Sequence, residues 1–352
     1  MKSKPKAALK AFLICTCTAL ILSACGGGGS GGILTSSSPQ EITVPIPLQA
    51  KMTADAAGNL YLADGATFTI VKVDPTGKAT LVAGRSGVRG VSDGVGASAE
   101  FYSPNDIAVD KDGNLYVTDS YKIDYIGSAS DNSFSPLGSI YRAAIRKITP
   151  DGTVTTLAGS ATAGSPSDMG YLDGIGTAAR FSNPQGIAVD LAGNVFVADY
   201  SNACIRKISP QGVVTTYTGS PASIGGRDGT LATASFNLVH ELKIDNAGNL
   251  YTIHSAGVGR WIRKISADGN VTSFGERVVA TNLLVNSITG TLYGIAQTYN
   301  GVYHNLLYSI SETGVESTVG TAVPSSPTSI AFVVSSSAAT LSNGVISRVP
   351  LP

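Results

Sequence analysis

Short runs of alternating apolar and polar residues, each ended by a turn containing Gly or Pro, repeat along most of the chain. One unit begins at Phe101 with FYSPNDIAVDKDGNLYVTD, a second begins at Phe181 with FSNPQGIAVDLAGNVFVAD, and a third begins at Phe236 with FNLVHELKIDNAGNLYTIH. A period of two residues is typical of half-buried strands, and steps rich in Asp, Gly and Asn are typical of tight hairpin turns. The pattern therefore predicts an all-β fold of repeated hairpins.

Each unit continues into a second hairpin. The motif Ile-Arg-Lys-Ile recurs at 145–148, 205–208 and 262–265, and a turn and another alternating run follow each copy. A repeating unit of four antiparallel strands predicts one blade of a β-propeller, in which the blades surround a central channel. At equal repeat positions, charged pairs such as Arg206 with Asp199 are expected to belong to the blade framework.

The Pro-x-Gly-Ile-Ala-Val-Asp opening, the Gly-Asn-Leu-Tyr-Val-x-Asp core and the Ile-Arg-Lys-Ile element together resemble the NHL repeat. The resemblance covers about residues 50–349 and implies a propeller of NHL-type repeats. Six units fill this length, so we expect a six-bladed β-propeller. The last unit has only three strand-like runs, and the isolated segment Glu41–Ile46 is expected to add the missing outer strand and close the ring.

The first 25 residues have the pattern of an export signal. Lysines precede an apolar run from Ala11 to Leu22, which suits a signal peptide and is short for a membrane span. The run ends in Leu-Ser-Ala-Cys, which resembles the bacterial lipobox and implies that Cys25 is lipidated. Residues 26–40 form a flexible Gly/Ser-rich linker, and residues 41–352 are the expected propeller domain. By resemblance to Gram-negative lipoproteins, Gly26 implies a lipid-anchored protein of the outer membrane.

Removal of the signal changes the charge and the cysteine content. The whole chain has 24 basic and 24 acidic side chains, and four lysines but no acid precede Cys25, so the mature chain would have 20 basic and 24 acidic side chains. This surface is a poor one for nucleic acid, which binds clustered Lys and Arg. Only Cys204 would remain unmodified, which excludes an intramolecular disulfide in the mature chain.

Aligned repeats place polar residues where each first strand begins, around one mouth of the central channel. The candidate binding residues at this mouth are Asn105, Asp106, Gln185, His240, Glu241 and Asn282. We expect no cofactor except, as one alternative, a divalent cation, whose ligands would be His240, Glu241 and Asn105. The other alternative is a hydrated rim without a ligand. The recurring Asp-Gly steps at Asp93, Asp173 and Asp228 are expected to form turns.

Strand direction predicts that all the long connections share this face of the propeller. They are the loops between blades, at about 85–100, 160–180 and 220–235, and an insertion at Tyr121–Ala143 between second and third strands. Long loops on a rigid scaffold commonly carry function. The leading hypothesis is a membrane-tethered, extracytoplasmic binding propeller, without catalytic residues, that engages a protein or glycan partner through this face.

The alternative hypothesis is a metal-dependent lyase or a lactonase-like enzyme with its site at the channel mouth. Some propellers that resemble this chain have several histidines around a central metal. This sequence has three histidines, His240, His254 and His304, and the repeat alignment places only His240 at the mouth. The sequence therefore favours binding over catalysis.

Overall fold

The computed structural model describes residues 41–43, 50–126, 136–160, 170–256, 259–274, 280–299, 303–310, 316–323, 329–334, 337–342 and 345–350. The chain divides into two units, Met1–Ser38 and Pro39–Pro352, and all of the described residues belong to the second. The predicted signal, Cys25 and the linker at 26–40 lie outside the described residues. Within the described part of the chain, no helix has the length and apolar character needed to cross a membrane.

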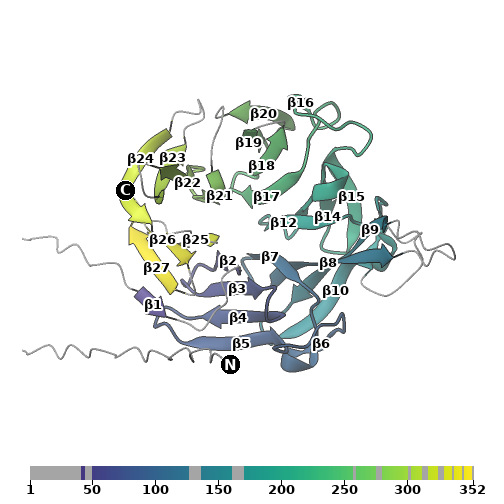
Figure 1. Cartoon of the computed structure of the whole chain (residues 1–352), viewed down its shortest axis with the longest axis horizontal. Helices are drawn as coiled ribbons and strands as arrows, with labels where there is room; N and C mark the ends of the chain where they lie inside the picture. Colours follow the sequence, from purple (N-terminus) through teal and green to yellow (C-terminus); the bar gives the residue numbers. More distant parts are fainter. Residues whose placement is uncertain are drawn as a thin grey trace, which may run out of the picture. The chain divides into compact units, whose positions relative to one another are not determined.

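Five antiparallel sheets are each built from one continuous stretch of chain, and we call them blades 1 to 5 (Figure 1). Their strands, from the channel outward, are β2 Lys51–Ala54, β3 Leu60–Asp64, β4 Thr69–Val73 and β5 Ala79–Gly84 in blade 1; β7 Pro104–Val109, β8 Leu115–Ile126, β9 Pro136–Ile148 and β10 Thr153–Ser160 in blade 2; β12 Pro184–Val189, β13 Val195–Asp199, β14 Cys204–Ile208 and β15 Val213–Gly219 in blade 3; β17 Val239–Ile244, β18 Leu250–Ala256, β19 Gly259–Ile265 and β20 Asn270–Phe274 in blade 4; and β21 Ala280–Val285, β22 Leu292–Tyr299, β23 Tyr303–Ile310 and β24 Glu316–Val323 in blade 5.

The remaining sheet is assembled from both ends of the described chain. It consists of β25 Ser329–Val334, β26 Ser337–Ser342 and β27 Val345–Pro350, and its outer strand is β1 Glu41–Thr43, which pairs antiparallel with β27. The expected count of six repeat blades is therefore corrected to five, because only three strands follow blade 5 among the described residues and the sheet they form is completed from elsewhere in the sequence. The pairing of β1 matches the strand expected at Glu41–Ile46, of which residues 44–46 lie outside the described part.

The innermost strands form a closed ring. β2 lies beside β7, β7 beside β12, β12 beside β17, β17 beside β21, β21 beside β25, and β25 beside β2 (Figure 1). Apolar cores fill the spaces between neighbouring sheets; in one of them Tyr116 and Ile145 of blade 2 pack with Ile187 and Val197 of blade 3. Burial of one such side chain stabilises the fold by about 1.5–3 kcal/mol. The ring is thus held by contacts between blades rather than by one central core.

The Asp-x-x-Gly-Asn steps form the tight hairpins that the sequence predicts. Asp110 accepts hydrogen bonds from the backbone N–H groups of Asp112 and Asn114, at 2.9 and 2.8 Å, and from the Asn114 side chain at 2.8 Å. Gly113 has a φ of 82°, a left-handed conformation that favours glycine. Asp55, Asp190 and Asp245 accept the equivalent bonds in blades 1, 3 and 4. Each of these hairpins links a first strand to a second strand.

A fully buried arginine joins blade 3 to the long loop that leads into it. Arg206 in β14 donates from Nη1 to Asp199 Oδ2 at 3.1 Å and from Nη2 to Asp173 Oδ1 at 2.6 Å. Its guanidinium lies 5.1 Å from the centre of the Phe181 ring. Asp199 ends the second strand and Asp173 lies in the loop, so one cation ties two separate segments to the third strand. The expected framework pair of Arg206 with Asp199 is confirmed.

Blades 2 and 4 contain the same arrangement. Arg146 binds Asp93 in the preceding loop at 2.8 Å, and Arg263 binds Asp228 at 2.9 Å. Directly after each loop aspartate, the chain forms a two-residue strand that pairs with the outermost strand of the blade: β6 Gly94–Val95, β11 Gly174–Ile175 and β16 Gly229–Thr230. The Asp-Gly steps therefore fasten the long loops to the blades.

Blade 4 differs from blades 2 and 3 at one position of this network. His254 of β18 stands at the repeat position that Asp119 and Asp199 occupy in the second strands of blades 2 and 3. The His254 side chain is buried, and its Nδ1 has no hydrogen-bond partner among the described residues. Burial, and then the charge of Arg263, lower the pKa of His254 from 6.5 to about 4. The neutral imidazole is the form that fits beside this arginine.

Because the folded state lowers the pKa of His254, we expect its contribution to stability to be complete above about pH 6.5 and to be lost as the pH falls toward about 4. Between pH 8 and about pH 5 the loss from this one group amounts to about 2 kcal/mol. Urea unfolding at both pH values gives the change in the free energy of unfolding for the wild type and for His254→Gln. The difference between these two changes measures the contribution of His254. Equal pH dependence in both would contradict the assignment.

Candidate functional site

The structure brings most of the predicted mouth residues to one small cavity. Asn105, Asp106, Gln185, His240 and Glu241 line a space of about 150 Å³ at the end of the channel where the first strands begin. The sixth predicted residue, Asn282, does not line the cavity but binds Lys51, which does. The repeat alignment therefore placed these residues at one end of the channel, as the structure does.

Lys51 occupies the centre of the polar network at this mouth. Its ammonium donates to Glu241 Oε1 at 3.0 Å and to Asn282 Oδ1 at 3.1 Å, and so connects blade 1 with blades 4 and 5. Lys51 was not among the candidate site residues. The position of Lys51 at the start of the first strand in blade 1 was the sequence signal that could have indicated it. Its closeness to Glu241 and Asn282, which are 190 and 231 positions away in the sequence, results from closure of the ring.

Glu241 is an ionised group held by two kinds of partner. Its second oxygen, Oε2, accepts a hydrogen bond from the backbone N–H of Leu283 at 2.6 Å. Burial by itself raises the pKa of Glu241, but the charges of Lys51 and Lys243, with the hydrogen bonds, outweigh burial and place the pKa below its ordinary value. The carboxylate is therefore charged at neutral pH, and the protein's own lysine neutralises it.

Asp106 joins the inner strands of blades 2 and 3. Its Oδ1 accepts from the backbone N–H of Ile107 at 2.9 Å, and its Oδ2 accepts from the backbone N–H of Ile187 at 3.1 Å. Burial raises the pKa of Asp106, against the opposing charges of Lys243 and Lys51. Both oxygens thus have backbone partners, and the side chain acts as a bridge between strands.

The other three mouth residues also have partners within the protein. His240 Nε2 lies 3.1 Å from Ser255 Oγ, and the His240 ring packs edge-to-face against Tyr200 at 4.9 Å between centres. Asn105 donates to Ser120 Oγ at 2.6 Å, and Gln185 donates to Asn183 Oδ1 at 2.8 Å. This rim is a network of hydrogen bonds.

The arrangement fits a divalent cation poorly. Within the described ranges, no group of three or more His, Cys, Asp or Glu side chains has the geometry to hold a metal ion. Of the expected ligands His240, Glu241 and Asn105, only Glu241 is a carboxylate, and the Lys51 ammonium already binds it. Placing a divalent cation beside that ammonium would bring like charges together. A bound cation stays a prediction. To bind Glu241, the cation would first have to displace the Lys51 ammonium from this carboxylate.

The ring of four-stranded antiparallel sheets around a channel defines a β-propeller. A sequence model described as the NHL repeat matches residues 101–122 and 181–208, which lie in blades 2 and 3. The protein is therefore a β-propeller, and segments of its blades 2 and 3 match the NHL repeat, as the sequence motifs predict.

Comparison with known proteins finds one similar sequence and several similar structures. The chain is 30% identical over 184 residues to Protein SUPPRESSOR OF QUENCHING 1, chloroplastic, of Arabidopsis thaliana; this region is 50% of the chain but only 15% of the plant protein. A streptogramin B lyase structure matches with a TM-score of 0.52 and 11% identity, over 90% of this chain and 98% of the lyase. The virginiamycin B lyase of Staphylococcus aureus matches with a TM-score of 0.50 and 14% identity, over 90% and 99%. At identities of 11% and 14%, the similarity to these two lyase structures shows the fold alone.

Replacing Lys51 by Met leaves Glu241 without its ammonium partner, so we expect unfolding to become easier by about 1–3 kcal/mol, a range reduced because Lys51 is about a third exposed. Urea unfolding at neutral pH measures the change. Adding Glu241→Gln should recover part of the loss, because the unpaired charge is then gone. Lys111→Met is the matched control, since its pair with Asp112 is exposed. An equal loss in the control, or none in Lys51→Met, would refute this role of Lys51.

Proposed function

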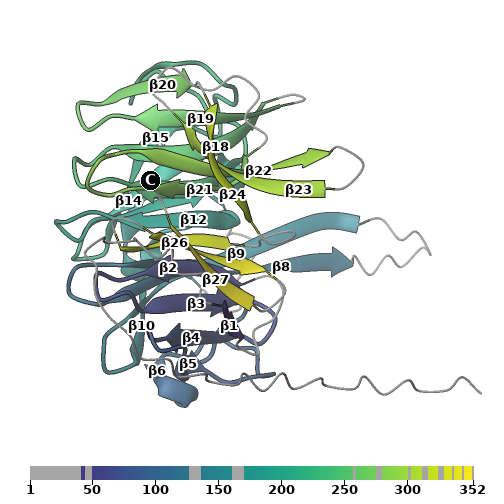
Figure 2. The same ribbon diagram turned by 90° about the vertical axis from the view of Figure 1, so that its left-hand side faces the viewer.

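We propose that this protein is a membrane-tethered, extracytoplasmic binding propeller that engages a protein or glycan partner through the face carrying its long connections. The observation that carries the proposal is the hairpin of β8 and β9. These strands have 12 and 13 residues, whereas the equivalent strands β13 and β14 of blade 3 have 5 each. Figure 2 shows β8 and β9 reaching beyond the neighbouring strands.

The hairpin extends past the channel mouth. Pro104, where β7 begins, pairs with Asp119 of β8, and β8 then continues to Ile126. Pairing with β9 continues along the extension, from Tyr121 opposite Arg142 to Ile126 opposite Pro136. The described extension of β8 and β9 and the described parts of the loops between blades therefore lie on one face. A paired hairpin is an ordered platform, and ordered recognition elements lose less conformational entropy on binding.

The chemistry of the channel mouth supports binding over catalysis. Asp106 is committed to two backbone N–H groups, and Glu241 is committed to Lys51 and to one backbone N–H. A general base or a metal ligand needs a carboxylate oxygen that substrate or metal can reach. The long-loop face offers surface instead, beside a mouth whose charged groups serve the structure.

The tether is the second part of the proposal. Its support lies in the sequence: a lysine-rich start, an apolar run that ends at Cys25, and a Gly/Ser-rich linker before the propeller. A lipid on Cys25 would hold the protein at a membrane of the cell envelope, with the outer membrane as the expected site. The flexible linker would let the propeller reach a partner away from the lipid surface.

Replacing residues 122–141 of the full-length protein by Asn-Gly keeps the pair Tyr121–Arg142 and removes the projecting hairpin. We expect binding to immobilised glycans or isolated envelope proteins to fall by roughly tenfold or more, because the main contact surface is gone. Thermal unfolding should stay within a few degrees of the wild type. A double substitution, Lys111→Ala with Asp112→Ala on the opposite face, is the control. Full binding by the trimmed protein would show that the assigned face is wrong.

Cys25→Ser removes the predicted lipid acceptor. We expect labelled palmitate to enter the wild type and not the variant, and the variant to leave the membrane fraction, because a thioether to lipid requires the cysteine sulfur. Cys204→Ser is the matched control, since Cys204 is buried. If Cys25→Ser still incorporates label or sediments fully with membranes, the lipid tether is refuted, whereas the binding face is tested separately.

A further inference from the structure

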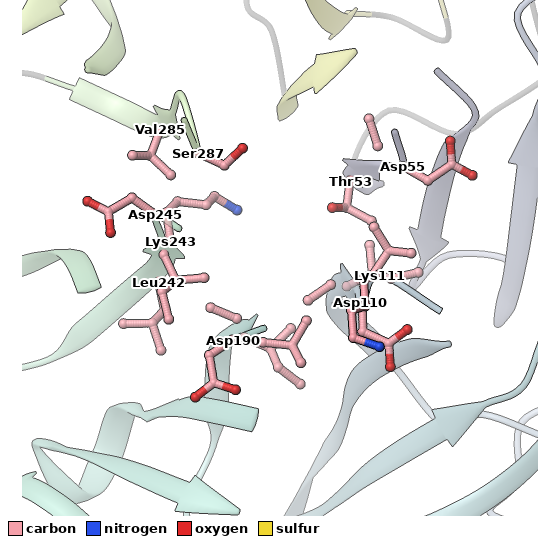
Figure 3. Close-up of a pocket in the computed structure, with 18 of the residues that line it drawn as sticks. Thr53, Asp55, Asp110, Lys111, Asp190, Leu242, Lys243, Asp245, Val285 and Ser287 are labelled. Carbon is pink, nitrogen blue, oxygen red and sulfur yellow. The ribbon is translucent and has the colours of Figure 1, made fainter. Parts of the chain in front are cut away.

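A second, larger cavity lies at the opposite end of the channel from the mouth. It has a volume of about 290 Å³ and is lined where the first strands end and their hairpins begin (Figure 3). This volume is near the lower limit for small-molecule sites in proteins. We call it the distal cavity. Its strands, β2, β7, β12, β17 and β21, are the same ones that form the mouth, so the position of each wall is set by the ring.

Apolar side chains form part of the walls of the distal cavity. Ala54, Val109, Val189 and Val285 contribute to the lining, one from each of four blades. Such walls favour the apolar body of a ligand over water. The cavity therefore differs from the mouth, whose lining is mostly polar.

Three polar side chains point into this space, and none of them has a side-chain partner among the described residues. Figure 3 shows Lys243 extending toward the middle of the cavity, with Thr53 and Ser287 on other sides. Among the described residues, the Lys243 ammonium has no hydrogen-bond or ion-pair partner, although its charge acts on Asp106 and Glu241 deeper in the channel. The other lining lysine, Lys111, is paired with Asp112 at 2.8 Å. Lys243 is thus the cation of this cavity that has capacity to bind a ligand.

The aspartates at the edge of the cavity are committed to their own hairpins. Asp245 accepts from the backbone and side chain of Asn249, at 2.8 Å each, and from the hydroxyl of Tyr251 at 3.1 Å. Asp55 has the equivalent partners. In Figure 3 the labelled aspartate carboxylates turn away from the middle of the cavity. Their negative charge still lies nearby and opposes a ligand with several negative charges.

We propose that the distal cavity binds a small amphipathic monocarboxylate. The carboxylate would accept hydrogen bonds from Lys243, with Thr53 and Ser287 as further donors, and the apolar body would lie against the valine walls. A charge-assisted hydrogen bond to an ammonium fixes the head group, and the surrounding aspartates select one negative charge over several. This site is independent of the long-loop face and of any partner bound there.

Calorimetric titration of the full-length protein with hexanoate, hexylammonium and 1-hexanol tests the head-group preference with one constant apolar body. We expect hexanoate to bind most tightly. Lys243→Met should weaken hexanoate by roughly tenfold or more and leave hexanol nearly unchanged, because only the ionic contact is lost. Lys111→Met is the matched control and should bind hexanoate as the wild type does. Val285→Phe, which fills the cavity from an apolar wall, should weaken hexanoate and hexanol alike.

Several results would overturn the proposal. Hexylammonium binding as tightly as hexanoate would mean that the aspartates, and not Lys243, set the preference. Unchanged hexanoate affinity in both Lys243→Met and Val285→Phe would place the ligand elsewhere, and no binding by the wild type would exclude the site. Thermal unfolding of each variant shows whether the variant is still folded, so that loss of a ligand contact can be told from loss of the fold. None of these results depends on the hairpin of β8 and β9.

Discussion

The buried arginine of blades 2, 3 and 4 is the interaction on which the long loops before these blades depend. A guanidinium out of contact with water destabilises the fold unless carboxylates and carbonyls surround it. Arg206 meets this need with Asp199 at the end of the second strand, Asp173 in the preceding loop, and the backbone oxygens of Arg180 and Leu172 at 2.9 Å each. A loop that would otherwise move freely becomes part of the blade, and the same holds for Arg146 and Arg263. The described parts of these loops are therefore fastened to the blades.

The channel has two ends of different chemistry because strand direction is the same in every blade. The first strands begin at the mouth, where Lys51 pairs with Glu241 and backbone N–H groups satisfy Asp106. All first strands end at the distal cavity, where valines form the walls and Lys243 has no partner among the described residues. The polar groups at the mouth thus stabilise the ring, whereas the Lys243 ammonium at the distal cavity can bind a ligand. The proposed partner face and the proposed small-molecule site therefore lie at opposite ends of the channel.

Much of the fold could be predicted from local sequence signals. Alternation and Asp-x-x-Gly-Asn steps predict the hairpins because both depend on residues close together in the chain, and the pair Arg206–Asp199 follows from its repeat position. The blade count was wrong because it depends on which strands complete the last sheet, and β1 pairs with β27 about 300 residues away. The role of Lys51 was missed for the same reason. Alignment showed which end of the channel a residue occupies, but distances across the ring come only from its closure.

Hydrogen exchange in the loop 170–183 tests the central claim most directly. If the arginine fastens this loop to blade 3, its amides should exchange nearly as slowly as those of β13 and β14, and Arg206→Met should speed exchange there far more than in the loop 220–238, which Arg263 holds. If Arg206→Met removes the protection of loop 170–183 but not of loop 220–238, each arginine orders the loop of its own blade, as the account predicts. Fast exchange of 170–183 in the wild type, or equal effects of Arg206→Met on both loops, would contradict it.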